Sequence, residues 1–305
     1  MKLFDLSMDA EDFKVAAGKK ISLKDYDSGW VPKWAKKQEE EKGKKAVKQQ
    51  ASDILEANRQ KLVEMQELFW ANGTYSMLIV LQGMDAAGKD GTIRHVMSGL
   101  NPQGCQVTGF KEPCEDELMH DFLWRNSKAL PERGIIGIFN RSYYEDVLIV
   151  KVRPEVLQKE KLPPALEGKG FWNQRYEDIN MFERHLTRNG TIVLKFFLNV
   201  SKAQQKQRLL KRLEDPDDNW KFSLTDLTER SKWDDYMEAY EEMLNMTSTE
   251  WAPWYIIPAD KKWVAHASIS EIIVSQIKKL NLEYPVLSKD QMAALEKAKA
   301  ELEKE

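Results

Sequence analysis

The chain has 305 residues, of which 42% are hydrophobic, and its formal net charge is only −3. This length is enough for one sizeable hydrophobic core with an appendage of tens of residues. The near-neutral charge argues against broad, sequence-independent binding to nucleic acid, so any polyanionic ligand has to be met by a local group of cations.

Cysteine and histidine usage excludes several further classes. Cys105 and Cys114 are too few for a disulfide framework, the histidines lack metal-ligand spacing, and no G-x-S-x-G motif accompanies them. The first residues, MKLFDLSMDAEDFK, carry acidic residues in place of a basic leader, and no apolar run approaches membrane-spanning length. We therefore expect a cytoplasmic protein with no membrane segment, no zinc site and no hydrolase triad.

The first part of the chain predicts an extension followed by a long helix. Residues 36–50 are charged and show no hydrophobic period, so we assign residues 1–50 to an N-terminal extension with a solvated lysine-rich surface. An arm that guides a polyanion is the alternative. Beyond it, apolar residues recur at roughly helical spacing from Ile54 to Phe69, and Asn72-Gly73 suits a helix C-cap.

Short apolar runs alternate with helix-like stretches along the rest of the chain. The expected strands are residues 76–82, 105–110, 134–140, 191–200 and 254–259. The expected helices are residues 89–99, 115–127, 171–188, 202–214 and 264–280. Because parallel strands need long crossover connections, this alternation predicts an α/β three-layer sandwich, in which a mainly parallel sheet of about five strands is flanked by helices.

Two segments depart from this alternation. Residues 214–236 are charged and rich in turn residues, and they predict a helical lid. Residues 286–305 predict a charged C-terminal helix, which leaves residues 51–285 as the central domain. Sheets of this kind bind ligands beyond the carboxyl ends of their strands, so we expect the chemistry at that edge.

The segment GMDAAGK, residues 83–89, directly follows an expected strand and precedes an expected helix, which is the context that a phosphate-binding P-loop requires. Gly83 and Gly88 permit the backbone angles that turn amide N–H groups inward, and the helix adds its positive amino end. Lys89 supplies a mobile cation to the phosphoryl group in flight. A plain turn with an exposed lysine is the alternative.

The loop departs from the usual P-loop pattern in two places. Asp90 stands where Ser or Thr normally reaches Mg²⁺, and Asp85 is the natural replacement because a hard cation prefers carboxylate oxygen. Alternatively, Asp85 bonds amides within the loop. After the apolar run 134–140, Arg141 replaces the common magnesium-binding aspartate. Its guanidinium can bind two phosphate oxygens, or it can form a structural ion pair with a following carboxylate.

Further basic residues stand near predicted strand and helix ends, where a polyanion could meet them. An ordinary surface charge is the alternative for each. These residues are Arg94, Lys111, Arg125, Arg133, Lys221 and Arg230.

Several segments together resemble the type-2 polyphosphate kinase family. The most specific are GMDAAGKDGTI (83–93), LNPQG (100–104), FNRSYYEDVL (139–148) and APWYIIPAD (252–260). Others are FWNQRYEDINMFE (171–183), TIVLKFFLNVSK (191–202) and NWKFS (219–223). The resemblance runs from about residue 51 to residue 282. The GKDG form of the loop, with NPQG after it, is similar to the subgroup (class III) that phosphorylates both AMP and ADP.

The resemblance implies a P-loop kinase-like fold and a Mg²⁺-dependent enzyme, with Mn²⁺ as the alternative metal. Such an enzyme moves the terminal phosphoryl group of inorganic polyphosphate to AMP or ADP, giving ADP or ATP, or runs in reverse. It implies catalytic roles for Asp85, Lys89 and Arg141, with Asp85 as metal ligand and Glu145 as a second candidate. Phosphate and nucleotide contacts are expected from Gly83, Met84, Ala86, Ala87, Gly88, Asp90, Gly91, Arg94, Arg125, Arg133, Lys221 and Arg230. Because relatives form dimers or tetramers, a homo-oligomer is implied.

The chemistry of the residues is compatible with this reaction, because a nucleotide's terminal phosphate is already ionised near neutral pH. Positioning and charge neutralisation can then suffice without a general base. One phosphoanhydride breaks as another forms, so we expect a roughly thermoneutral, reversible transfer. An ATP-dependent nucleoside or nucleotide kinase is the first alternative, since it uses the same architecture. A non-catalytic polyphosphate- or nucleotide-binding regulator is the second. Nucleic-acid and membrane partners are not expected.

Overall fold

A computed structural model describes residues 10–163, 166, 168 and 170–305. Its centre is a five-stranded sheet with the strand order β2-β3-β1-β4-β5, and every pairing between neighbouring strands is parallel. The strands are β1 (Ser76–Gln82), β2 (Cys105–Gly109), β3 (Ile136–Asn140), β4 (Thr191–Asn199) and β5 (Trp254–Pro258). This arrangement confirms the expected α/β fold with its parallel sheet.

The central strand β1 shows why the apolar runs become strands. All its residues are buried, and β3 and β4 pair with it on either side. A continuous apolar run is what a strand covered on both faces requires. β3 begins two residues later than expected, because Gly134 has a left-handed φ of 81° and donates its N–H to the Tyr75 carbonyl in a turn.

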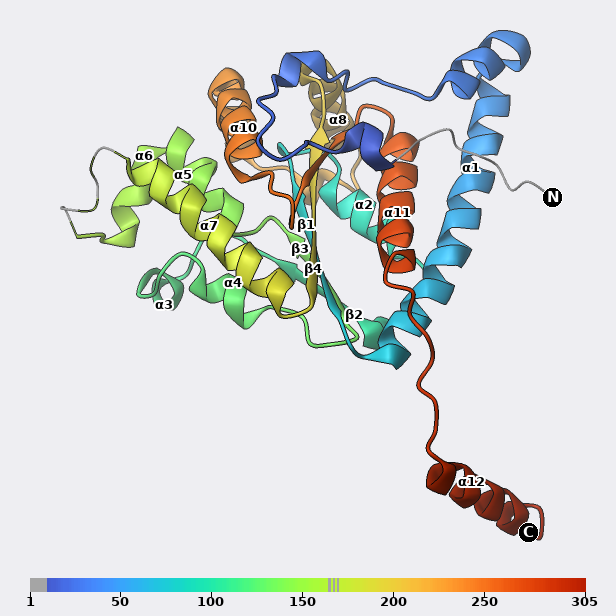
Figure 1. Cartoon of the computed structure of the whole chain (residues 1–305). Coiled ribbons are helices and arrows are strands. Elements are labelled where there is room, and N and C mark those ends of the chain that lie inside the picture. The colour runs from blue at the N-terminus through green and yellow to red at the C-terminus, as the bar shows by residue number, and fades with distance from the viewer. Residues whose placement is uncertain (1–9, 164–165, 167, 169) are drawn as a thin grey trace.

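Helices cover both faces of the sheet and make the outer layers of the sandwich (Figure 1). α7 and α10 lie on one side, α2 and α11 lie on the other, and α1 packs against the outside of α11. The bounds are α1 (Lys33–Asn72), α2 (Lys89–Val96), α7 (Phe171–Arg188), α8 (Lys202–Glu214), α10 (Trp233–Thr247) and α11 (Lys262–Lys278). The three-layer prediction is therefore confirmed.

Helix α1 begins much earlier than its hydrophobic period indicates. The charged residues 36–50 are helical, with a break in the backbone at Gly43, where φ is 77°. Lysine and glutamate are good helix formers, and Lys37 pairs with Glu41 one turn away, so the segment needs no apolar period of its own. Residue 50, the expected end of the extension, thus lies inside α1, while residues 1–9 of that extension fall outside the described residues.

The segment before α1 runs along the outer edge of the sheet. Val15 donates its backbone N–H to the Trp254 carbonyl over 2.8 Å, and Lys14 forms an antiparallel bridge with Tyr255. Phe13 and Ile21 are buried nearby, and two short 3₁₀ helices, η1 (Ala10–Phe13) and η2 (Leu23–Asp25), belong to this segment. The segment therefore covers the edge of β5, which would otherwise present unpaired backbone groups.

The helix expected over residues 115–127 is split in two, so that prediction was wrong in its length. The Asp121 carboxylate accepts the N–H of Leu123 over 2.9 Å, a local turn that competes with a continuous helix. The pieces are α3 (Glu115–Leu118) and α4 (Trp124–Lys128). Further short helices are η3 (Pro102–Gly104), η4 (Tyr143–Val147), α5 (Ile149–Val152), α6 (Pro154–Leu157) and η5 (Gln158–Glu160).

The two segments that interrupt the alternation differ in how they meet the body. Residues 214–236, here called the lid segment, contain η7 (Asn219–Lys221), α9 (Leu224–Ser231) and the start of α10. α12 (Lys289–Leu302) projects away from the body, and all its residues are exposed (Figure 1). Among the described helices, none is both long enough and apolar enough to cross a membrane.

Candidate functional site

The turn between β1 and α2 has the backbone of a phosphate loop. Gly83 has φ 152° and Gly88 has φ 113°, and Ala86 between them also adopts a left-handed φ of 60°. A Cβ atom at Gly83 would lie 3.0 Å from the carbonyl oxygen of Leu198, so any side chain here would push β4 away as well as strain the loop backbone. The loop therefore depends on glycine as the sequence predicts, and α2 presents its amino end to it.

Lys89 is held by the loop that it serves. Its side chain is buried, and its ammonium donates to the carbonyl of Gly83 over 2.6 Å and to that of Met84 over 3.2 Å. Burial lowers the pKa of Lys89, and the nearby Arg141 charge lowers it further. The sequence predicts a mobile cation here, whereas the structure has a fixed one.

Two residues of α8 that the sequence analysis missed fasten the loop from behind. Arg208 donates to the carbonyls of Ala86 and Ala87 over 3.0 and 2.6 Å, and Gln205 donates to the carbonyl of Asp85 over 2.9 Å. One signal could have identified them. They stand three residues apart on the helix that follows β4, at the strand edge where the loop lies.

Arg141 lies between two carboxylates at the mouth of the loop. Its guanidinium is 2.5 Å from Asp85 Oδ1 and 3.7 Å from Glu145 Oε2. The charge of Glu145, followed by that of Asp85, raises the pKa of Arg141. The backbone turn is fixed by a left-handed φ of 64° and by the Arg141 N–H, which donates to the Leu81 carbonyl. The structure thus brings Lys89, Asp85 and Arg141 to one place.

The candidate metal ligands can be judged from the same geometry. Among the described residues, no group of three or more His, Cys, Asp or Glu side chains could hold a metal ion. Asp85 and Glu145 both reach the Arg141 guanidinium, so they supply two hard oxygen donors beside the loop. Mg²⁺ is commonly bound by one or two carboxylates together with substrate phosphates and water. The donor set therefore fits a metal that arrives with phosphate.

Asp90 has a partner within the protein. Its carboxylate accepts the side-chain amide of Asn140 over 2.6 Å, which joins the start of α2 to the end of β3. Gly91 lies in the first turn of α2. Met84 and Ala87, which belong to the loop, have buried side chains. The structure consequently gives Asp90 a role in holding two elements together at the loop.

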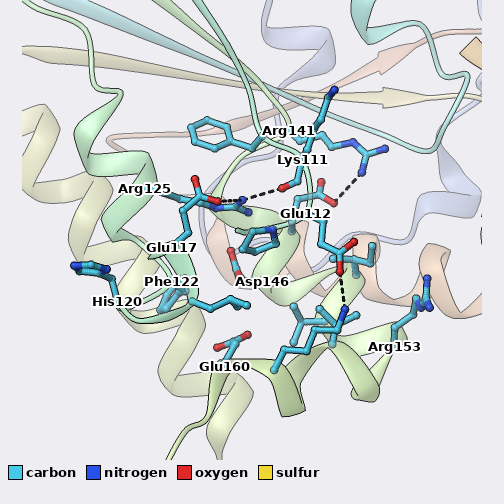
Figure 2. A pocket seen from close by; sticks show the side chains of 18 of the residues that line it. Lys111, Glu112, Glu117, His120, Phe122, Arg125, Arg141, Asp146, Arg153 and Glu160 are labelled. Carbon is cyan, nitrogen blue, oxygen red and sulfur yellow. Dashed lines mark hydrogen bonds and ion pairs between the residues drawn. The ribbon is translucent and has the colours of Figure 1, made fainter. Parts of the chain in front are cut away.

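A cavity of about 360 Å³ adjoins the loop on the side of α3 and α4 (Figure 2). Arg141 and Glu145 lie at the loop end of this cavity, and Thr225 of the lid segment borders it. Other side chains that line it are Phe110, Lys111, Glu117, Phe122, Arg125, Asp146, Ile149, Val150 and Arg153. The cavity thus combines apolar rings with many charged side chains of both signs, and its volume is that of a small-molecule site.

Two charged side chains of this cavity, Arg125 and Asp146, differ in whether the protein itself supplies their partners. Arg125 donates to the Lys111 carbonyl over 2.8 Å, and its guanidinium lies over the Phe110 ring at 5.5 Å. Asp146 is buried, and its Oδ2 accepts no hydrogen bond from any described residue. Burial raises the pKa of Asp146 to about 7. Since buried polar atoms are rarely left unpaired, Oδ2 indicates a place for a donor on a ligand.

Four cations from three helices lie near one another, and one of them, Arg208, contacts the loop. Lys262 at the start of α11 lies near Arg208 and Lys211 of α8 and near Arg94 of α2. Burial lowers the pKa of Lys262, and the charges of these three neighbours lower it further. We call these four residues the cationic group. The sequence analysis identified Arg94 but none of the other three.

The remaining expected contacts are divided between the two edges of the sheet. Arg133 donates to the carbonyls of Thr74 and Asn189 over 2.5 and 3.2 Å. Those residues precede β1 and β4, so Arg133 lies at the amino ends of the strands, opposite the loop. Arg230 donates to Gln205 over 2.7 Å and so supports the loop indirectly, while Lys221 pairs with Asp218 inside the lid segment. The structure does not bring Arg133 to the site.

Comparisons with known proteins point to one family. The model of the family described as Polyphosphate kinase 2 (PPK2) matches residues 44–285. The chain is 46% identical over 281 residues to an ADP-polyphosphate phosphotransferase of Rhodopseudomonas palustris, covering 92% of this chain and 93% of the relative. It is 47% identical over 238 residues to an AMP/ADP-polyphosphate phosphotransferase of Meiothermus ruber, covering 78% and 85%. The crystal structure of Polyphosphate Kinase 2 from Arthrobacter aurescens superposes with a TM-score of 0.80 at 38% identity, covering 94% of this chain and 95% of that one.

Gly83→Ala tests whether the loop backbone makes the phosphate site. We expect it to weaken binding of inorganic tripolyphosphate by about 10-fold, because the left-handed backbone and the contact with Leu198 together strain any side chain here. Isothermal titration calorimetry measures the affinity, and circular dichroism checks the fold. Gly109→Ala is the control, since a Cβ atom there meets nothing within 4 Å. Equal affinities in the two variants would contradict the assignment.

Proposed function

Because the chain belongs to the Polyphosphate kinase 2 family, it is a polyphosphate–nucleotide phosphotransferase, and we propose that it carries the terminal phosphoryl group of inorganic polyphosphate to both AMP and ADP. The observation that carries this proposal is the meeting of Lys89, Asp85 and Arg141 at the loop, since Arg141 also lines a cavity of about 360 Å³. The relative named for both AMP and ADP supports the choice of acceptors.

We propose that the acceptor nucleotide occupies the cavity between the loop and α3–α4. Arg125 and Arg141 would meet its phosphates, and the rings of Phe110 and Phe122 offer apolar surface to a base. The unpaired Oδ2 of Asp146 offers a hydrogen-bond acceptor to the ribose hydroxyls or an exocyclic amine of a nucleotide. Thr225 borders this space, so we assign the lid segment the role of closing over the nucleotide.

We propose that the donor polyphosphate approaches from the opposite side, along the cationic group. Arg94, Lys211 and Lys262 bring positive charge to Arg208, which binds the loop carbonyls, and the charge of Asp218 offsets only part of it at Lys262. A chain of linked phosphates carries one negative charge or more per unit, so it matches a run of cations better than a compact nucleotide does. Donor and acceptor then meet at Lys89 and Arg141.

The transfer itself depends on positioning and charge. Lys89 and Arg141 neutralise the oxygens of the phosphoryl group as it leaves one phosphate for another. The terminal phosphate of the acceptor is already ionised, so none of these residues has to remove a proton. Asp85 and Glu145 would hold Mg²⁺, which would supply further charge neutralisation for the phosphates. Mn²⁺ is the alternative ion. The arrangement is equally usable in either direction.

Three further properties belong to the proposal. We propose a homo-oligomer, a dimer or a tetramer, and we propose a cytoplasmic location because the two cysteines are free in the structure. We also propose that the chain is divided into an N-terminal extension (1–50), a central domain (51–285) and a C-terminal helix (286–305). An ATP-dependent nucleotide kinase is the competing function, since it uses the same P-loop architecture.

The activity can be tested directly with long-chain polyphosphate, Mg²⁺ and AMP in the absence of ATP. We expect ADP to form first and ATP to follow, since each product phosphate can accept the next phosphoryl group. Chromatographic separation of the nucleotides measures both steps. A protein that makes ADP only when ATP is supplied is the ordinary kinase, and one that binds polyphosphate without turnover is the regulator. Either result would refute the proposal.

The catalytic assignment predicts that Lys89→Ala and Arg141→Ala each lower kcat by about 100- to 1000-fold, because each removes a charge that faces the transition state. Arg133→Ala is the matched control. Arg133 is also a basic residue that the sequence predicts at the phosphate site, but it binds carbonyls at the opposite edge of the sheet. We expect its kcat to stay within about twofold of the original protein. Comparable losses in all three variants would contradict the placement.

The placement of donor and acceptor predicts a separation of Michaelis constants. The double variant Arg94→Ala/Lys262→Ala should raise KM for polyphosphate by about 10-fold and leave KM for AMP unchanged, because charged hydrogen bonds to the donor are lost. Arg125→Ala should do the reverse. Steady-state kinetics with each substrate varied in turn measures both. The opposite pattern would show that donor and acceptor occupy exchanged sides.

A further inference from the structure

Two of the segments that carry the family resemblance, residues 171–183 and 191–202, contribute no side chain to the lining of the proposed nucleotide cavity. Each nevertheless contains a charged residue that is completely buried, Glu183 on α7 and Lys195 on β4. Their charged groups are 2.6 Å apart. A buried ion pair is weak evidence for stability, because well-packed apolar residues of similar size often serve as well. The pair therefore calls for another explanation.

The hydrogen bonds of the pair are fully used. Lys195 directs its ammonium at Glu183 Oε2 over 2.6 Å, at the Thr247 carbonyl over 2.7 Å and at the Tyr144 hydroxyl over 2.9 Å. The other carboxylate oxygen, Glu183 Oε1, accepts the hydroxyls of both Tyr143 and Tyr144, each over 2.8 Å. Both tyrosines are themselves completely buried. The network thus fixes two neighbouring side chains at a single oxygen atom.

Those two tyrosines belong to the turn that carries Arg141, from which only Ser142 separates them. The turn includes the left-handed φ of Arg141, a conformation that residues other than glycine avoid. Its other anchor is Ser142, whose hydroxyl accepts the side-chain amide of Gln82, the residue before the phosphate loop, over 3.2 Å. A strained turn persists only where its surroundings over-determine it. The tyrosine hydroxyls, bound to Glu183, hold the turn at the end that follows Ser142.

We infer that Glu183 and Lys195 are positioning residues, which hold Arg141 in its productive place by anchoring the hydroxyls of Tyr143 and Tyr144. This inference rests on the proposed function, because it gives Arg141 its role in phosphoryl transfer. The pair is absent from the lining of the cavity, and its hydrogen bonds to the site run through the two tyrosines of the turn, while the Thr247 carbonyl at the end of α10 holds Lys195 from the other side. A displacement of about 1 Å at a reacting group can cost about 100-fold in rate, so an anchor of this kind bears on turnover.

The test compares two double variants that both remove the ion pair without leaving a lone buried charge. Glu183→Leu/Lys195→Met keeps the volume and removes the acceptor for the tyrosine hydroxyls. Glu183→Gln/Lys195→Met keeps an oxygen at that place. We expect the leucine variant to lower kcat by about 10- to 100-fold with both KM values nearly unchanged, and the glutamine variant to restore most of the turnover. Equal losses in the two variants, or losses confined to KM, would overturn the inference.

A second measurement separates positioning from general damage. In an Arg141→Ala background, Glu183→Leu/Lys195→Met should cause no further loss of kcat, because the side chain that it misplaces is already absent. A purely structural role predicts the same fold-loss in both backgrounds. An equal fold-loss of kcat in the two backgrounds would refute the inference even if the first comparison came out as expected.

Hydrogen–deuterium exchange tests the anchor without relying on turnover. The amides of residues 141–145 should exchange faster in the leucine variant than in the glutamine variant, at similar global stability in urea. Unchanged exchange there would overturn the inference, whereas absence of polyphosphate-dependent activity in the original protein would refute only the proposed function. Should the leucine variant fail to fold, Tyr143→Phe/Tyr144→Phe removes the same two hydroxyls and carries the same expectations.

Discussion

The contact between Arg141 and Asp85 is the constraint on which the rest of the site depends. It joins the turn after β3 to the loop after β1, and these neighbouring strands are parallel, so both segments emerge at the same edge of the sheet. Because Arg141 and the nearby Lys89 together balance the two carboxylates, neither acid stands as an uncompensated charge beside a site built for anions. At the same edge, Gln205 and Arg208 hold the loop, and Arg141 forms part of the wall of the adjoining cavity.

The sheet and most of its helices could be predicted from the sequence, because their apolar runs have the length and spacing that burial on both faces demands. β1, α7 and α8 have the expected bounds. The start of α1 and the break between α3 and α4 could not be predicted. In the first case tertiary packing and charge pairs support a helix without an apolar period, and in the second a single aspartate turn interrupts one.

The candidate site divides in the same way. The loop glycines, Lys89, Asp85 and Arg141 are recognisable because their chemistry lies in a short continuous motif. Arg208, Asp146 and Lys262 are not, since their importance comes from neighbours far away in the chain. Arg133 shows the opposite error. Its charge and its place near a strand suggest phosphate binding, but it stands at the beginning of that strand, and only the direction of the strand decides the matter.

The way in which the loop holds Lys89 has a consequence for the entropy of catalysis. A free lysine has four rotatable side-chain bonds, and ordering them at the moment of transfer would add to the barrier. Here the carbonyls of Gly83 and Met84 already order that chain, and the loss of freedom is incurred once, when the protein folds. The ammonium then meets each successive phosphate with little reorganisation, which suits an enzyme whose substrate is a chain of identical units.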